Sequence, residues 1–144
     1  MKDIFVDNCA AKNFENPLDI HYKNFISWLM NEGVLVVSQK LLVEYGRTCG
    51  GCAASSNIVA IVGHLTARGR LIRFKNSELK KFSIPKYIAR KLLSNHEDHV
   101  HIKVVIFSHR KYAITADNNL RCDLNNYPGY AITAVQHPKN IPYN

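Results

Sequence analysis

Four acidic residues stand where a folded chain could bring them together: Asp7, Glu44, Asp98 and Asp117. Carboxylates that share one cleft repel each other strongly unless a cation lies between them. Hard divalent ions with oxygen ligands are the usual solution, and Mg²⁺ binds through a few carboxylates while it keeps several waters. If these side chains converge, we expect a metal site that could activate a water and stabilise the oxyanions of phosphodiester cleavage.

Each of these acids also has a structural explanation when it is taken alone. Asp7 could end a strand, Asp98 could cap a helix, and Asp117 could begin the turn ADNN. Glu44 is harder to explain in this way, because its neighbours in LLVEYGR are apolar and Arg47 is the one cation three or four positions beyond it. The argument for a site therefore depends on convergence and not on any single residue.

The positive charge of the chain is concentrated in residues 68–91, which we call the basic segment. The whole chain has 144 residues and a formal net charge of +8. The basic segment holds nine basic residues and one acid, Glu78, whereas the rest holds ten of each. This segment is either a face that binds a polyanion, most simply nucleic acid, or a solvated face that aids solubility. The side chains that we expect to contact RNA are Arg70, Arg73, Lys80, Lys81, Lys86 and Arg90.

The elements that would position these residues alternate between strand and helix. Short apolar, β-rich runs predict strands at 3–7, 34–38, 70–74, 111–116 and 130–136. Helical spacing with proline or glycine at the ends predicts helices over 15–33, 39–46, 55–68, 84–95 and 97–109. Such alternation is typical of an α/β layered domain with a mainly parallel sheet. Ligands of these folds bind at the carboxyl ends of the strands, where the strand order reverses.

Length and composition fit one folded domain, which we place at residues 1–137, followed by a loose tail at 138–144. Apolar residues make up 47% of the chain, which favours a packed core over disorder. No apolar run approaches the roughly 20 residues of a membrane span, and the first residues, MKDIFVD, lack the apolar core of a signal peptide. We therefore expect a cytoplasmic protein without a membrane partner, in which the cysteines are free thiols.

The stretch TCGGC contains a C-x-x-C pair, Cys49 and Cys52. Such a pair could hold zinc with two further ligands, or act in redox chemistry if it opened a helix directly after a strand. A glycine-rich turn with incidental thiols explains the stretch better, because the other cysteines are isolated and the pair follows a helix.

The stretch HEDHVH at 96–101 resembles a metal cluster, but it lacks the H-E-x-x-H order of a zinc protease. We expect its histidines at the surface or behind the metal site, with His101 near Asp98. Three tyrosines could stack on nucleobases, although packing in the core is the commoner use of this residue. They are Tyr45, Tyr87 and Tyr112.

In their sequence contexts the four acids resemble the site residues of the PIN-domain nuclease family. That family has an acid after the first strand, a VEY-like glutamate on an early helix, an aspartate opening a later helix and a T-x-D after the fourth strand. Here these are Asp7 in IFVDN, Glu44 in LLVEYGR, Asp98 in HEDHVHIKVVIFS and Asp117 in ITADNNL. The resemblance spans nearly the whole chain, and the size is that of compact prokaryotic members such as VapC-type toxins.

The resemblance implies a three-layer α/β/α fold with strand order 3-2-1-4-5, and Mg²⁺ or Mn²⁺ held by the four acids. Many members have D-x-N after the first strand, whereas here Asn8 follows Asp7 directly and Cys9 takes the next position. Many also have another acid two or three residues after the last aspartate, where residues 118–120 are Asn, Asn and Leu. Asp123 could take the place of that acid as a fifth ligand.

Taken together, these features predict a metal-dependent endoribonuclease, with the toxin of a toxin–antitoxin pair as its expected biological role. The alternative is a catalytically weak PIN-like module that binds RNA or a protein partner through the basic segment. A non-nucleolytic α/β protein, such as a phosphoryl-transfer regulator, would explain an acidic pocket but not the basic segment. Expected partners are RNA, an acidic protein such as an antitoxin, and a second copy of the chain in a homodimer.

Overall fold

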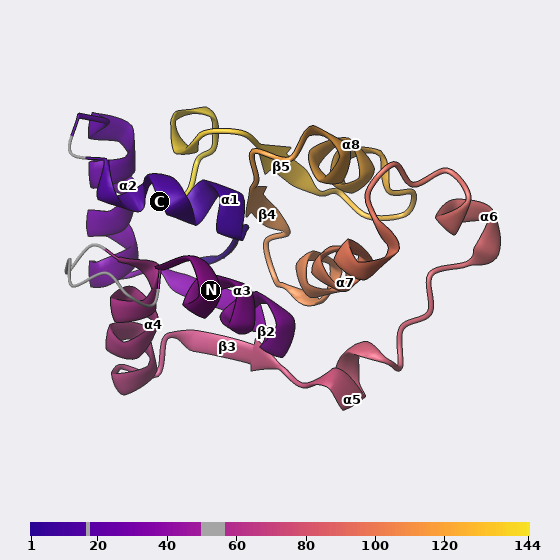
Figure 1. Cartoon of the computed structure of the whole chain (residues 1–144), viewed down its shortest axis with the longest axis horizontal. Coiled ribbons are helices and arrows are strands. Elements are labelled where there is room, and N and C mark those ends of the chain that lie inside the picture. The colour runs from indigo at the N-terminus through magenta and orange to yellow at the C-terminus, as the bar shows by residue number, and fades with distance from the viewer. Residues whose placement is uncertain (17, 50–56) are drawn as a thin grey trace.

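The computed structural model describes residues 1–16, 18–49 and 57–144. Its centre is a parallel sheet in the order β3-β2-β1-β4-β5 (Figure 1). The strands are β1 (Asp3–Val6), β2 (Val34–Ser38), β3 (Leu71–Phe74), β4 (Tyr112–Ile114) and β5 (Thr133–Val135). The expected five-stranded parallel sheet and its strand order are therefore confirmed.

The central strands are apolar along their whole length because both faces of the sheet are covered. Every residue of β1 is buried, and so are the last four of β2. Strand β1 pairs with β2 through Ile4 and Leu35 and with β4 through Val6 and Ile114. The strand order thus reverses at β1, which is where a doubly wound sheet offers its ligand crevice.

Helices cover both faces of the sheet, with α2 and α4 on one side and α7 and α8 on the other (Figure 1). This division follows from right-handed crossovers, because the chain moves from β1 outward to β3 and then returns to β4 and β5. The helices are α1 (Asn8–Ala11), α2 (Ile20–Asn31), α3 (Gln39–Cys49), α4 (Ile58–Ala67), α5 (Asn76–Leu79), α6 (Lys86–Ala89), α7 (His99–Phe107) and α8 (Asn118–Asn126). The described residues also form the 3₁₀ turns η1 (Lys12–Glu15), η2 (His96–Asp98) and η3 (Pro138–Asn140). None of the described helices is long and apolar enough to cross a membrane.

The prediction of one helix over 84–95 is wrong, because the helix there is the single turn α6. After it, the backbone N–H groups of Leu93 and Ser94 donate to the buried carboxylate of Asp123, at 2.8 Å each. These bonds hold the chain in a loop and take the donors that a longer helix would need. Helix α8, which supplies Asp123, is absent from the predicted elements, because Leu120 and Leu124 are its only apolar residues.

The prediction of a loose tail at 138–144 is also wrong. Pro138 and Ile141 are buried, and η3 forms at the start of this segment. The ring of Tyr143 lies 5.1 Å from that of Phe25 and 5.2 Å from that of Trp28, measured between centroids. Apolar side chains at alternate positions therefore fix the last residues against α2.

Candidate metal centre

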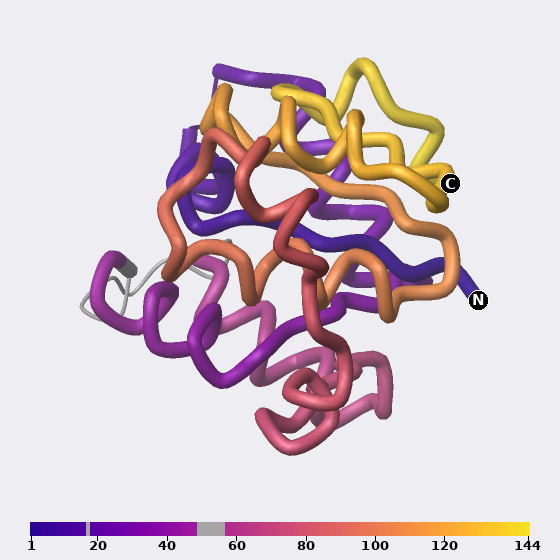
Figure 2. Tube along the Cα trace, turned by 90° about the vertical axis from the view of Figure 1, so that its right-hand side faces the viewer, coloured from indigo at the N-terminus to yellow at the C-terminus, as the bar shows by residue number. Residues whose placement is uncertain are grey.

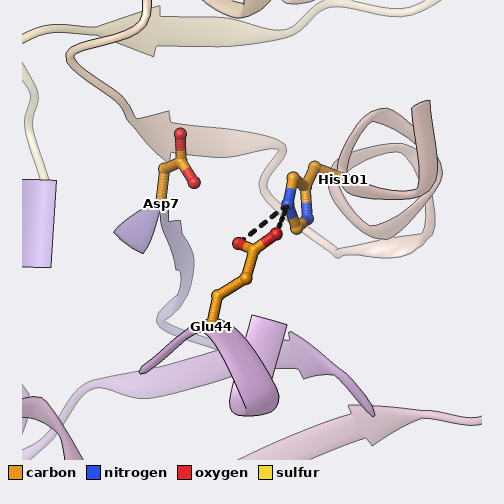
Figure 3. A group of neighbouring side chains, drawn as sticks. All are labelled: Asp7, Glu44 and His101. Carbon is orange, nitrogen blue, oxygen red and sulfur yellow. Dashed lines mark hydrogen bonds and ion pairs between the residues drawn. The ribbon is translucent and has the colours of Figure 1, made fainter. Parts of the chain in front are cut away.

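Three side chains from three elements meet at the carboxyl end of β1 (Figure 3). Asp7 follows β1 directly, Glu44 lies in the second turn of α3, and His101 lies in the first turn of α7. One ligand atom of each lies within 4.8 Å of the others. The ring Nε2 of His101 is 3.2 Å from Oε2 and 3.3 Å from Oε1 of Glu44. We call these three residues the site cluster.

The carboxylate of Asp7 is buried and is fixed by donors on both oxygens. Oδ1 accepts the backbone N–H of Asn8 at 2.8 Å, and Oδ2 accepts the hydroxyl of Thr115 at 2.7 Å. The Cys9 thiol donates to Oδ2 at 3.1 Å. Burial, followed by the charge of Asp7, raises the pKa of this thiol, so it remains a donor. Cys9 and Thr115 therefore set the orientation of the first site carboxylate.

Glu44 is positioned by the way α3 leaves the sheet. The Ser38 hydroxyl accepts the N–H of Leu41 at 3.2 Å, which starts the helix at the end of β2. The hydroxyl of buried Tyr45 donates to the carbonyl of Val6 and so ties α3 to the end of β1. Lys40, one turn before Glu44, places its ammonium 3.0 Å from Oε1. The position of Glu44 is therefore set by neighbours on both sides of it in α3.

His101 is 1% exposed and packs against Phe5, with 5.6 Å between ring centroids. Its Nδ1 is buried and has no hydrogen-bond partner among the described residues. Nε2, the nitrogen that faces Glu44, can donate a hydrogen bond to this carboxylate. With the proton moved to Nδ1, the same atom would offer its lone pair to a metal ion. The expectation of a surface histidine, or of one behind the site, does not hold here, because His101 is buried and belongs to the cluster itself.

Asp98 lies beside the site cluster, with Oδ1 4.0 Å from Nε2 of His101. It precedes α7, yet its side chain accepts no capping hydrogen bond from that helix. The side chain of Asp98 therefore does not cap α7, contrary to the structural explanation suggested by the sequence. Burial raises the pKa of Asp98, and the charges of Glu44 and Asp7 raise it further against the opposing effect of His101 and Lys40.

The neighbouring groups shift the pKa of Glu44 in the opposite direction. Burial tends to raise it, but hydrogen bonds and charges from His101 and Lys40 outweigh burial, so the pKa of Glu44 lies below its ordinary value. Burial tends to lower the pKa of Lys40, and its bond to Glu44 reverses this shift. Glu44 is therefore held ionised, while Asp98 binds a proton more readily than an ordinary aspartate does.

The carboxylate of Asp117 caps α8 and does not join the site cluster. Its Oδ1 accepts the N–H groups of Asn119 and Leu120 at 2.9 and 3.1 Å. Its own N–H donates to Oγ1 of Thr115 at 3.2 Å, and Thr115 in turn binds Asp7. Asp117 thus lies at the same edge of the sheet as Asp7, where it begins a helix.

Asp123, which the sequence suggested as a fifth ligand, is not part of the site cluster, and its carboxylate is bound by other donors. Besides the two backbone N–H groups of Leu93 and Ser94, its carboxylate accepts the Ser94 hydroxyl at 2.6 Å. Buried carboxylates need such donors, and these hold the loop that leads from α6 to Asp98. Asp123 therefore supports the segment before the site and not the site itself.

The basic segment divides into one structural cation and several exposed ones. The guanidinium of Arg70 donates to the carbonyls of Leu29, Met30 and Gly33 at 2.6–2.8 Å, and so satisfies the end of α2. Arg70 is consequently unsuited to the expected contact with RNA. Arg73, which donates to the Gln39 amide, is exposed. The remaining expected contacts are exposed and form no ion pair within the described ranges: Lys80, Lys81, Lys86 and Arg90.

The cysteine pair cannot be assessed, since Cys52 and the side chain of Cys49 lie outside the described residues; Cys9 and Cys122 are free thiols. Sequence reasoning missed Lys40, although a lysine four residues before a glutamate on a helix is a recognisable pair. It placed His101 near Asp98 but not in the cluster.

Comparisons with protein-family models, curated proteins and solved structures found no significant match.

Proposed function

We propose that this protein is a metal-dependent endoribonuclease of PIN-like architecture, with Asp7 and Glu44 as the principal metal ligands. The observation that carries the proposal is the meeting of two carboxylates and an imidazole, each from a different element, at the point where the strand order reverses. The exposed cations of the basic segment support a polyanionic substrate.

The donor set fits a divalent cation. Asp7 and Glu44 offer carboxylate oxygens within 4.8 Å of each other, and Nε2 of His101 lies within the same distance. Oxygen donors alone suit Mg²⁺, whereas a set that includes imidazole shifts the preference toward Mn²⁺ and other transition metals. A cation held there would activate a water and stabilise charge on the phosphate oxygens.

The protein's own side chains prepare this site in three ways. Cys9 and Thr115 hold the carboxylate of Asp7 in one orientation. Lys40 and His101 keep Glu44 ionised, as its lowered pKa reflects. Asp98, with its raised pKa, is the carboxyl group best suited to exchange a proton during the reaction.

The test is an RNA cleavage assay with Mg²⁺ or Mn²⁺ on wild type and Asp7→Asn. We expect the substitution to abolish cleavage and to weaken metal binding, while the fold remains, because one charge leaves a crowded acidic group. Glu32→Gln is the matched control, since Glu32 is exposed and pairs with Lys2, away from the cluster. Full activity of Asp7→Asn would contradict the proposal.

A binding module without strong catalysis is the second candidate, and one observation favours it. Lys40 at 3.0 Å and His101 at 3.2 Å can satisfy the charge of Glu44 without a metal ion. This candidate requires RNA or protein binding that is independent of divalent ions, together with no cleavage by wild type. An acidic antitoxin that competes with RNA for the basic segment fits either candidate, and we propose it as the protein partner.

A further inference from the structure

A pocket of about 330 Å³ lies between α6 and the end of α8, apart from the site cluster. Its walls are mainly apolar and aromatic, with Tyr87, Ile88 and Leu93 on one side and Tyr127 on the other. A few polar groups also line it, among them Lys91. A concave, apolar space with few polar groups, at the small end of the usual range, fits one small ligand.

The two tyrosines that line this pocket are prepared in different ways. Tyr87 is 65% exposed, so one face of its ring is open to a ligand. Tyr127 is buried, and its hydroxyl has no hydrogen-bond partner among the described residues. A buried hydroxyl without a partner is unfavourable, and a ligand that carries donors or acceptors at its edge could satisfy it. The ring of Tyr130, 5.8 Å away between centroids, fixes that of Tyr127 from outside the pocket lining.

The charge around the pocket indicates what kind of small ligand it takes. Lys86, Arg90 and Lys91 are exposed on the same short stretch of chain as Tyr87. Figure 1 places α6 at the outer side of α7 and α8, and Figure 2 shows the segment from that side. An aromatic pocket beside exposed cations is the arrangement that binds the bases and the phosphates of single-stranded nucleic acid.

Two chain connections relate the pocket to the site cluster. Helix α8 is capped by Asp117, at the sheet edge of Asp7, and contributes Cys122 and Asn126 to the pocket. At the rise of an α-helix this places the pocket roughly 8–14 Å along the α8 axis from Asp117. On the other wall, Leu93 is fixed by Asp123 and lies five residues before Asp98. A strand of RNA could therefore reach both places.

We propose that this pocket binds one unpaired nucleobase of the RNA strand, with the neighbouring cations on the adjacent phosphates. The inference rests on the proposed function for its choice of RNA as ligand. It adds a second place of contact, apart from the site cluster, at which one base of the RNA is held. Of the three tyrosines considered for stacking, only Tyr87 is exposed; Tyr45 is buried and Tyr112 packs beneath Arg110.

The test measures binding of a fluorescent single-stranded RNA of mixed sequence to the full chain, with a chelator present so that cleavage cannot occur. We expect Tyr87→Ala to lower affinity roughly 5- to 100-fold, the range for loss of one base stack, without a change in salt dependence. Tyr87→Phe should keep wild-type affinity because the ring remains. Ile20→Ala, which removes an exposed apolar side chain on α2, is the control and should have no effect.

A second arm uses the same RNA with an abasic site at each position in turn. One position should lose affinity with wild type and not with Tyr87→Ala, because the base and the ring belong to one contact. Equal affinity of wild type and Tyr87→Ala would overturn the inference. A loss of RNA affinity in Tyr87→Phe as large as that in Tyr87→Ala would also overturn it, because the ring is still present. Tight binding of an acidic peptide at Tyr87 in place of RNA would do the same. If wild type cleaves RNA and Tyr87→Ala binds RNA as tightly as wild type, the nuclease proposal holds and the pocket has no part in RNA binding.

Discussion

The imidazole Nε2 of His101 lies 3.2 Å from Oε2 of Glu44, although the two residues are 57 positions apart in the chain. This contact joins helices α3 and α7 above the end of β1 (Figure 3). It brings a nitrogen into a group that the sequence presents as purely carboxylate. The chemistry of the site therefore depends on what His101 does there.

Replacing His101 by glutamine should weaken Mn²⁺ binding about 10- to 100-fold, the usual effect of losing a ligand or a group that orients one. Mg²⁺ binding should fall less, because Mg²⁺ prefers oxygen donors and the glutamine carbonyl can supply one. Titration calorimetry with each ion checks this. His96→Gln is the matched control, since His96 is exposed in η2. Equal losses of affinity for the two ions would mean that His101 is not a metal ligand and only positions Glu44.

Without metal, Asp98→Asn should raise the free energy of unfolding at neutral pH. The pKa of Asp98 is raised in the fold above its ordinary 3.8. A raised pKa gives stability that is complete below the unfolded value and is lost as pH rises through the folded value. The charged form thus costs stability at pH 7, and asparagine removes this cost. Urea unfolding with a chelator should show the gain at pH 7 and none near pH 3.

Glu44→Gln should have the opposite effect in the same experiment. The pKa of Glu44 is lowered below its ordinary 4.5, so its ionised form adds stability above that pH and loses it as pH falls through the folded value. We expect a loss of stability at pH 7 that shrinks toward acid. Changes of the same sign for Glu44→Gln and Asp98→Asn would show that the charges of Lys40 and His101 do not separate the two acids.

Arg70→Met should lower the free energy of unfolding by about 2 kcal/mol, because three carbonyls at the end of α2 lose their charged donor. The salt dependence of RNA binding should stay the same, since the guanidinium of Arg70 is bound to backbone carbonyls and is not expected to contact phosphate. Chemical unfolding and binding curves check the two statements separately. Arg90→Met is the matched control: its stability should be that of wild type, as Arg90 is exposed.

Replacing Lys86 and Arg90 together by alanine should weaken binding of all RNA sequences about equally. The slope of log affinity against log salt should become flatter by roughly 0.7–1 unit for each lost phosphate contact. Both residues are exposed, and the backbone bond from Arg90 to Lys86 keeps them one turn apart. Turnover of bound RNA should change little.

The control for this pair is Lys12→Ala with Lys23→Ala, which removes the same charge from exposed positions outside the basic segment. An effect of equal size in the control would mean that net charge alone governs binding. An unchanged salt slope in the Lys86 and Arg90 variant would mean that these residues do not contact RNA phosphates, and it would favour a protein partner for the basic segment.

The sequence by itself determined the sheet. Strands such as DIFV and VLVVS are short, β-rich and buried on both faces, so their pattern does not depend on distant partners. It also placed Asp7 directly after one strand and Glu44 on the helix that follows the next, and parallel strands present their carboxyl ends at one edge. The order of the strands, in contrast, came from the resemblance.

Only the tertiary structure decided the roles of the remaining polar residues. Nothing local distinguishes Asp117 from Asp98, yet the first caps a helix and the second does not. Asp123 and Arg70 bind backbone groups about 30 to 40 positions away, and these contacts assign both of them to the support of the fold. Hydrogen bonds and buried charges depend on which groups come together across the core, and the local sequence pattern does not predict these long-range contacts.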